Sequence, residues 1–463
     1  MKKMLSSFLN KLVIHYIYPY FKVVNEHMDK LYDSINDDYI DKLHHDIIDS
    51  QDKVSVNLDR VISENTSLIG YNEELLKRMD ALEYQLSNKN DLKTGAISGK
   101  SVLFLNDTYN DFHHGSSATS FVIQNRLLSV CSNVDSLKID IIRKINDSPL
   151  LYDNFINEEY FKSWSINNEE IINKIKKCDA LVVNGEGCIS HYNKDTCQLL
   201  YIIYVSSKYL NKQCYIINTS IYTSDYVNNI SELEQREFEK ILRLVIDNVD
   251  YVAVRDYYSY MNVNKFVITD HLRMSFDSLP LYVRDYYKKK EVIQGKYILI
   301  SGGNFLPHNF EKYIYELKKS IPSKYKNMQW FFLYCKVESA PCLDDLEHFK
   351  KLKKYGINLV EAENVDEYLS VIDNAEFLIS GRFHHSIAAF MLDTPFISFK
   401  TNTRKMEAII SMFEKNNVLL KNNYLNSTLK LLKSDDFFMK NSVSKKEEIY
   451  RLAENNYVFL ERK

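Results

Sequence analysis

The spacing of apolar residues changes along this chain, and each spacing predicts a different kind of structure. Between residues 54 and 86, apolar side chains recur at alternating intervals of four and three. One position of this repeat is held by Val54, Val61, Leu68, Leu75 and Leu82, and the other by Leu58, Asn65, Asn72, Met79 and Leu86. A repeat of this length predicts a coiled coil, and asparagine within the seam favours a parallel, two-stranded pairing. We therefore expect a homo-oligomer formed through residues 54–86, with a long helix packed on its own protein as the alternative.

The residues around this repeat complete a helical extension over residues 1–95. Its first 25 residues are basic and aromatic, but Lys11, His15 and Lys22 interrupt an apolar run that is already too short for a membrane span. Two interpretations of this segment remain. It is either an amphipathic helix in peripheral contact with the inner face of the membrane, or a helix that packs on the protein itself.

From Ser101 onward, short apolar runs alternate with segments of helical period. The runs in the first part of the chain are 102–106, 137–141, 180–184, 214–218, 251–254 and 266–269. Those in the second part are 297–301, 330–334, 358–360, 377–380 and 396–399. Helical segments between them include 117–130, 169–177, 196–210 and 231–247. This alternation predicts the α/β class, with the strands in parallel, doubly wound sheets.

Length and a break in the pattern predict more than one domain. A chain of 463 residues exceeds what a single core usually holds. The pattern breaks over 280–294, where the charged run RDYYKKKE is typical of a connector. We therefore predict Rossmann-like domains over 97–285 and 290–440 that face each other across a cleft. Residues 441–463 are expected to form a last helix that returns to the first domain.

Composition narrows the classes of partner and site. Lys and Arg number 59 against 62 Asp and Glu, a net charge of −3, so no basic excess indicates a nucleic-acid partner. The seven cysteines are dispersed without a Cys-x-x-Cys pair, which indicates reduced thiols in a cytoplasmic protein. The paired histidines at 113–114 and 384–385 lack the His-Glu-x-x-His spacing, so we expect neither a metal nor another cofactor.

Polar residues gather where predicted strands end, and one of these ends is especially informative. Arg382, His384 and His385 directly follow the strand 377–380 and open a helix. Open parallel sheets bind ligands at the carboxyl ends of their strands, and a helix N-terminus beside cations attracts anions. We therefore predict an anion-binding cleft at this point. The alternative is that Arg382 pairs with a carboxylate and the histidines merely begin the helix.

The same arrangement recurs at other predicted strand ends. The further candidates at these ends are Asp107, His114, Asn184, Glu186, His191, Arg255, Ser301, Asn304, Asn402 and Lys405. Glu186 stands between two glycines, so its carboxylate could extend into the cleft and bind or deprotonate a substrate hydroxyl. The alternative for Glu186 is a solvated turn. Arg255 precedes Asp256, and the usual arrangement of such a dipeptide is a surface ion pair.

Five segments, in this order, resemble the polysaccharide pyruvyl transferase family. They are NDT with HHGSSAT, VVNGEGCISH, CYIINTS, VAVRDYYS, and SGRFHHSIAAFMLDTPFISFKTNTRKMEAI, and the resemblance covers residues 102–413. Members of this family resemble GT-B glycosyltransferases, in which two Rossmann-like domains face a cleft. They transfer pyruvate from phosphoenolpyruvate to sugar hydroxyls and release phosphate. This chain departs from the family at Cys188, where members often have threonine, and at His385, which makes a double histidine.

The resemblance implies roles for Arg382, His384 and Arg255, and the chemistry and strand-end positions of the other candidates suggest theirs. Arg382 and His384 match the Arg-x-His pair at the donor, with His384 as the acid, and Arg255 matches an arginine of the preceding domain. Glu186 joins Arg382 and His384 as a catalytic candidate. The donor phosphoenolpyruvate would be bound by Arg255, Arg382, His385, Ser301, Asn304, Asn402 and Lys405. The acceptor, a sugar or lipid-linked oligosaccharide of a bacterial surface polysaccharide, would meet Asp107, His114, Asn184, Glu186 and His191.

Two other functions stay open at this level. One is a GT-B glycosyltransferase that uses a nucleotide-activated sugar in capsule or lipopolysaccharide synthesis, because anionic donors of that kind suit the same arginines and histidines. The other is an inactive scaffold of such a pathway, which would act through its coiled coil.

Overall fold

The computed structural model describes residues 97–111, 113–145, 147, 149–222, 231–303, 306–335, 343–401 and 403–460. The predicted helical extension, its coiled coil at 54–86 and the segment 1–25 lie outside the described residues. The same holds for Asn304 and Asn402 among the candidate site residues. No helix within the described ranges is long and apolar enough to cross a membrane.

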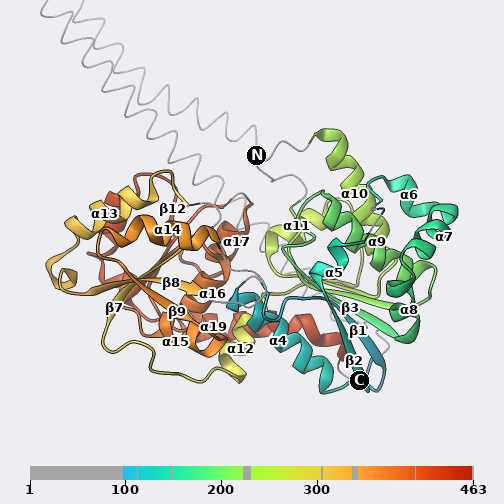
Figure 1. Ribbon diagram of the computed structural model, residues 1–463, viewed down its shortest axis with the longest axis horizontal. Coiled ribbons are helices and arrows are strands. Elements are labelled where there is room, and N and C mark those ends of the chain that lie inside the picture. The colour runs from blue at the N-terminus through green and yellow to red at the C-terminus, as the bar shows by residue number, and fades with distance from the viewer. Residues whose placement is uncertain are drawn as a thin grey trace, which may run out of the picture. The chain divides into compact units, whose positions relative to one another are not determined.

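Two six-stranded sheets organise the described residues (Figure 1). The first, in the order β2-β1-β3-β4-β5-β6, consists of β1 (Ser101–Asp107), β2 (Asn133–Lys138), β3 (Ala180–Glu186), β4 (Gln213–Thr219), β5 (Tyr251–Val254) and β6 (Leu272–Met274). The second, in the order β12-β11-β10-β7-β8-β9, consists of β7 (Tyr297–Ser301), β8 (Gln329–Cys335), β9 (Asn358–Ala362), β10 (Phe377–Ser380), β11 (Phe396–Phe399) and β12 (Leu419–Leu420). Neighbouring strands pair in parallel throughout. The predicted α/β class with two Rossmann-like sheets is confirmed.

Helices connect successive strands within each sheet. Those around the first sheet are α4 (His114–Leu128), α5 (Ile139–Arg143), α6 (Tyr152–Ile156), α7 (Glu158–Asn167), α8 (Glu169–Lys177), α9 (Lys194–Lys208), α10 (Glu232–Ile246), α11 (Tyr257–Asn264) and α12 (Leu279–Asp285). Those around the second are α13 (Phe310–Ser320), α14 (Leu343–Lys353), α15 (Val365–Asp373), α16 (Phe383–Met391), α17 (Lys405–Met412), α18 (Tyr424–Leu431) and α19 (Val443–Glu454). Short 3-10 turns lie at η2 (Ser323–Tyr325), η3 (Asn416–Val418), η4 (Asp435–Phe438) and η5 (Asn455–Leu460). We call β1 to β6 with their helices the N-terminal half, and β7 to β12 with theirs the C-terminal half.

Two of the predicted strands are misplaced. The run 137–141 is divided between the end of β2 and the helix α5, in which Ile139 and Ile142 are buried while Ile141 is exposed. That spacing of three belongs to a helical turn rather than to a strand. The run 266–269 follows α11 as irregular chain with Ile268 at 92% exposure, and the strand of that region is β6.

The order of the strands creates one crevice in each sheet. In the first sheet the chain passes from β1 to β2 on one side and then to β3 on the other. In the second sheet β7 is flanked in the same way by β8 and β10. Connections that leave neighbouring strands in opposite directions open a crevice at the carboxyl ends, which is where such sheets bind ligands. The two crevices therefore lie at the ends of β1 and β3 and at the ends of β7 and β10.

The chain's last described residues return to the first sheet. Phe459 of η5 stacks on Tyr215 of β4 with ring centroids 4.3 Å apart. The Asn456 side chain accepts the backbone N–H of Asn218 at 2.9 Å and donates to the carbonyl of Phe276 at 2.7 Å. A segment that follows the C-terminal half in sequence thus completes the core of the N-terminal half.

Candidate functional site

The two halves meet where α4 begins. The ring Nε2 of His114 lies 2.7 Å from the carbonyl oxygen of Ala362, at the end of β9. A Cβ added at Gly115 would lie only 2.3 Å from the Cβ of His384 on α16. Glycine therefore allows the start of α4 to approach α16 closely, and side chains from both halves come within hydrogen-bond distance.

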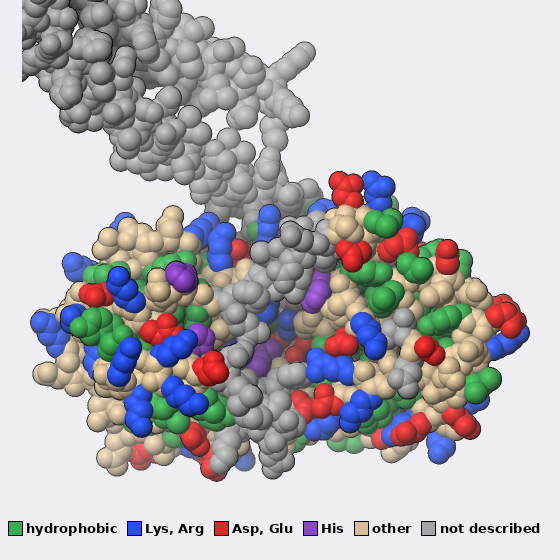
Figure 2. Space-filling view, turned by 45° about the horizontal axis from the view of Figure 1, so that its top comes forward, with side chains coloured by type: hydrophobic (Ala, Val, Ile, Leu, Met, Phe, Trp, Pro, Cys, Tyr) green, Lys and Arg blue, Asp and Glu red, His purple; other side chains and the backbone are tan. Residues whose placement is uncertain are grey.

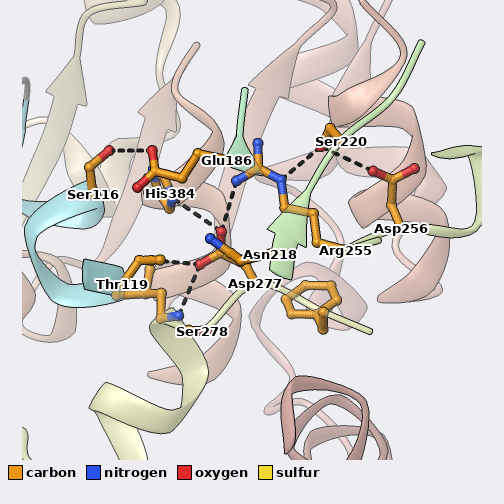
Figure 3. A network of polar contacts seen from close by, with 12 residues as sticks. Ser116, Thr119, Glu186, Asn218, Ser220, Arg255, Asp256, Asp277, Ser278 and His384 are labelled. Atoms are coloured by element: carbon orange, nitrogen blue, oxygen red, sulfur yellow. Dashed lines mark hydrogen bonds and ion pairs between the residues drawn. The ribbon is translucent and has the colours of Figure 1, made fainter. Parts of the chain in front are cut away.

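Asp277 is the centre of the polar network at this junction (Figure 3). Its Oδ2 accepts from Arg255 Nη1 at 3.0 Å and contacts His384 Nε2 at 3.2 Å. Its Oδ1 accepts from Thr119 Oγ1 and from the backbone N–H of Leu279, both at 2.9 Å. Asp277 follows β6 and is fully buried, so one carboxylate joins the arginine of one half to the histidine of the other.

The charges around Asp277 keep it ionised. Burial by itself would raise the pKa of this carboxyl, but the charge and hydrogen bond of His384, the charge of Arg255 and the Leu279 N–H outweigh burial. The pKa of Asp277 is consequently held below its ordinary value. A carboxylate without a proton can only accept hydrogen bonds.

Arg255 is a buried residue, which corrects the expectation of a surface pair with Asp256. In addition to Asp277, its Nε donates to Ser220 Oγ at 2.7 Å, and its guanidinium lies over the ring of Phe383, 4.4 Å from the centroid. Asp256 instead caps α11 by accepting the backbone N–H of Ser259 at 2.8 Å. Arg255 is thereby held at the carboxyl end of β5.

Arg382 also pairs with a carboxylate, as the plainer interpretation of its motif predicted. Its Nη2 lies 2.7 Å from Asp345 Oδ2, near the start of α14. The other oxygen, Oδ1, is buried and has no hydrogen-bond partner among the residues that the structure describes. A Cβ at Gly302 would lie 1.7 Å from that oxygen, so the glycine after β7 makes room for the carboxylate. Asp345 therefore uses only one of its oxygens on the arginine.

Lys405 opens α17 and has no such counter-ion. No carboxylate among the described residues lies within ion-pair distance of its ammonium group. Burial, followed by the charges of Arg255 and Arg382, lowers the pKa of Lys405 to about 8. The charges of both arginines act on this lysine, so the three cations lie near one another.

His385 and Ser301 form a second, neutral contact beside Arg382. His385 Nδ1 lies 2.8 Å from Ser301 Oγ, which donates to Ser380 Oγ at 2.6 Å. The other nitrogen, Nε2, is buried and has no hydrogen-bond partner within the described ranges. Burial, and then the charges of Arg382, His384 and His114, lower the pKa of His385 well below its ordinary value, so its ring is neutral near pH 7. Burial likewise lowers the pKa of His114.

Glu186 lies at the crevice of the first sheet. Its carboxylate accepts from Thr108 Oγ1 at 2.7 Å, from Asn184 Nδ2 at 3.1 Å and from Ser116 Oγ at 3.0 Å. Glu186 therefore binds Ser116, and the preceding residue, Gly115, is the one that contacts His384. The backbone of Glu186 has φ +36°, a conformation that turns the end of β3 sharply. Glu186 is thus a bound, buried carboxylate and not a solvated turn residue.

The remaining acceptor candidates lie around the same sheet. Asp107 Oδ1 accepts from Ser120 Oγ at 2.7 Å and from the backbone N–H of Tyr109 at 3.0 Å. His191 lies in the loop after β3, where its ring contacts Ser190 Oγ and Asn193 Nδ2, each at 2.8 Å. These contacts anchor both side chains locally, on the N-terminal half.

Sequence reasoning did not identify Asp277 or Asp345. Asp277 was overlooked because the preceding strand was placed at 266–269, so the polar turn after β6 was not seen as a strand end. A correct placement of β6 would have identified it. Asp345 lies within a helix rather than at a strand end, and no sequence signal separates it from the neighbouring acidic residues of α14.

Cations are in excess over carboxylates at this junction. Arg255 pairs with Asp277 and Arg382 with Asp345, whereas no carboxylate of the described part of the chain lies within ion-pair distance of Lys405. In Figure 2, Lys, Arg and His side chains gather inside a hollow on the face of the molecule that it shows. Planar guanidinium groups bind carboxylate and phosphate oxygens in pairs, so this arrangement is suited to a small, multiply charged anion.

The chain matches one protein family and is similar in fold to several solved structures. A family model described as polysaccharide pyruvyl transferase matches residues 115–403. No curated protein matches the chain. Similar folds include the UDP-bound S. aureus MnaA, with 13% identity, TM-score 0.48 and coverage of 79% of this chain and 98% of that one. A UDP-GlcNAc 2-epimerase from Neisseria meningitidis has 13% identity, TM-score 0.49 and coverage of 78% and 98%. Anabaena HepE, with UDP and glucose, has 7% identity, TM-score 0.46 and coverage of 78% and 96%; similarities at this level carry no information about this chain's ligand.

Proposed function

This chain belongs to the polysaccharide pyruvyl transferase family and is a transferase, and we propose that it moves pyruvate from phosphoenolpyruvate onto sugar hydroxyls of a bacterial surface polysaccharide or its lipid-linked precursor. The observation that carries the proposed donor is that Arg255, Arg382 and Lys405 lie near one another, while Lys405 has no carboxylate within ion-pair distance among the described residues. Phosphoenolpyruvate carries a carboxylate and a phosphate on the same carbon, so its anionic oxygens can contact several cations at once.

The residues divide the binding of the donor between the two halves. Arg255 presents its guanidinium from the end of β5, and Arg382 from the turn after β10. Lys405 adds a third cation from the first residue of α17, where the helix N-terminus also favours negative charge. On this proposal the donor binds where both halves contribute charge, so it also stabilises their contact.

The chemistry requires one proton on carbon and the release of phosphate. A protonated His384 transfers its proton to the methylene carbon, which becomes the methyl group as the C=C electron pair forms the new C–H bond. The central carbon accepts the oxygen of a sugar hydroxyl, and its bond to the phosphate oxygen breaks. In a ketal, a second hydroxyl of the same sugar forms the second C–O bond. Of the two protons that the hydroxyls lose, one is balanced by the proton gained by the methyl group, and the other is carried by the released hydrogen phosphate.

The base for the acceptor hydroxyl belongs to the N-terminal half on this proposal. Glu186 reaches the crevice of the first sheet, and the start of α4 separates it from His384. Its three hydrogen-bond donors hold the carboxylate in one orientation. Asp107, at the end of the neighbouring strand, is the second carboxylate available to an acceptor sugar.

Calorimetric titration with phosphoenolpyruvate, and in parallel with uridine and cytidine nucleotides, tests the donor. We expect saturable binding of phosphoenolpyruvate that Arg382→Ala weakens by about 10- to 100-fold, the value of one or two charge-assisted hydrogen bonds. Binding of a nucleotide with none of phosphoenolpyruvate would contradict the proposal and favour a glycosyltransferase.

Two variants keep this result interpretable. Arg243→Ala removes the same charge from the exposed face of α10 and should leave donor binding unchanged. Arg382→Ala alone leaves Asp345 buried without its partner, which destabilises a fold. The double variant Arg382→Ala/Asp345→Asn removes that uncompensated charge and should still bind the donor as weakly as Arg382→Ala.

A further inference from the structure

We propose that Asp277 is a positioning residue that holds a proton on Nε2 of His384 and thereby makes Nδ1 the atom that exchanges protons with the substrate. The identity of the substrate rests on the proposed function, but the position of the proton on His384 does not. The inference therefore concerns a property of the protein that can be measured without any ligand.

The first argument is that Asp277 cannot turn away from His384. Its Oδ1 is fixed by Thr119 on α4 and by the backbone N–H of Leu279 at the start of α12. Its Oδ2 is shared by Arg255 and His384. With four contacts on two oxygens in a fully buried site, the carboxylate has one orientation, and Oδ2 faces the imidazole.

The second argument is that this oxygen must accept. Because Asp277 stays ionised and Arg255 Nη1 also donates to Oδ2, the His384 atom at 3.2 Å can only be an N–H donor. A neutral imidazole carries one ring proton, so a proton on Nε2 leaves a lone pair on Nδ1. The hydrogen bond made by one ring nitrogen thus decides the role of the other.

The third argument concerns the surroundings of Nδ1. This nitrogen makes no hydrogen bond with any residue that the structure describes. Gly115 packs against His384, and a Cβ at that position would lie 3.1 Å from Nδ1, so any side chain there would crowd this nitrogen. The ring of His113 is 4.9 Å from that of His384, but its Nδ1 already accepts the backbone N–H of Ser116. The second nitrogen of His384 is therefore the one available to a substrate.

The proton is then returned to the same atom in the reaction cycle. The imidazolium gives its Nδ1 proton to the methylene carbon and becomes the neutral ring with its remaining proton on Nε2, facing Asp277. The lone pair left on Nδ1 takes up a proton from water before the next turnover, and the proton that the acceptor hydroxyl gives to Glu186 returns to water. Asp277 itself neither gains nor loses a proton in either step, and it acts only through His384.

Nitrogen NMR of the full-length protein labelled with 15N-histidine tests this inference. In the neutral form, wild-type His384 should show a protonated Nε2 and an unprotonated Nδ1. In Asp277→Asn, whose amide can turn its NH2 toward the ring, the signals should move toward the opposite tautomer or a mixture. The signals are assigned by their loss in His384→Gln. A wild-type protein with its proton on Nδ1 would overturn the inference without any variant.

Matched variants separate positioning from a structural role. Thr119→Val removes one donor from Oδ1 but leaves Oδ2 in place, so the tautomer of His384 should not change. Asp345→Asn makes the same carboxylate-to-amide change beside the other arginine and should also leave the His384 signals unchanged.

Kinetics provides the second measurement. In Asp277→Asn we expect kcat to fall by about 100-fold or more, the usual contribution of a positioned acid, while the calorimetric affinity for phosphoenolpyruvate does not weaken. An unchanged tautomer, or a loss of affinity equal to the loss of kcat, would overturn the inference. Absence of phosphoenolpyruvate binding in the wild type would instead count against the proposed function, with the NMR result still valid.

Discussion

At the scale of single residues, the charge of Lys405 is the property of the site most sensitive to pH. The two arginines stay charged at any pH that the protein tolerates. Lys405, in contrast, has a pKa lowered to about 8 by burial and by those arginines. Its charge in the folded protein is therefore present below about pH 8 and lost above it.

Affinity for an anionic donor should follow this titration. A phosphate monoester has lost its second proton by about pH 7, so further change at higher pH comes from the protein. We expect the calorimetric affinity for phosphoenolpyruvate to fall by about tenfold between pH 7 and pH 9.5 as Lys405 becomes neutral. Lys405→Arg should flatten this dependence, whereas Lys400→Arg, at an exposed lysine paired with Glu407, should retain it. Equal pH profiles for all three proteins would show that Lys405 does not contact the donor.

Residue types at strand ends could be identified from sequence, but their partners could not. The order of the motifs placed Arg255, Arg382 and His384 at such ends, and the structure has them there. Which carboxylate each one meets depends on how the two halves pack, because Asp277 and Asp345 lie 22 and 37 residues from Arg255 and Arg382. A local sequence pattern cannot predict an ion pair between residues so far apart in the chain.

At the scale of elements, the site depends on how closely α4 and α16 approach. Gly115 and His384 are the point of contact, and their separation leaves no room for another carbon atom. The N-cap His113, which accepts the backbone N–H of Ser116, fixes where α4 begins and hence which residue meets α16.

Gly115→Ala should separate these two helices. The added methyl group would have to displace a Cβ and a helix rather than a flexible side chain, and overpacking of this kind costs about 1–3 kcal/mol. We expect a lower midpoint of thermal unfolding together with loss of transfer activity. Gly187→Ala is the stability control, because a Cβ there meets nothing within 4 Å. A Gly115→Ala protein as stable as wild type would show that the contact is looser than described.

The bounds of a strand could be predicted from the sequence where most of its side chains are buried. The strands β5, β7, β10 and β11 have the predicted bounds, since each is an unbroken buried run closed by polar residues. Both misplaced strands, β2 and β6, lie at sheet edges. An edge strand buries fewer side chains and carries a weaker pattern, and β2 has only one buried residue. The predicted helices lie within three residues of α4, α8, α9 and α10.

At the scale of the whole molecule, the chain's last turn is part of the N-terminal half's core. Phe459 is fully buried and contacts Tyr215 and Tyr251 of neighbouring strands. The hydroxyl of Tyr251 also donates to the carbonyl of Asn455. Folding of the first sheet is therefore completed only when the end of the chain is in place.

Phe459→Ala should destabilise the N-terminal half, although Phe459 lies about two hundred residues later in the sequence than the strands it contacts. Truncation of a buried phenylalanine costs about 3–5 kcal/mol, so we expect a clearly lower denaturant midpoint. The half-buried neighbour Val458 offers the control, since Val458→Ala should cost much less. If the two variants unfolded at the same denaturant concentration, η5 would not contribute to the core.

The contact between His114 and Ala362 has a consequence for comparisons among related sequences. The histidine meets a main-chain carbonyl, which every amino acid provides. A substitution at position 362 keeps this carbonyl and requires no compensating change at position 114. The two positions should therefore vary independently in an alignment. Methods that infer spatial proximity from correlated substitutions would then miss this junction, even though it holds the two halves together.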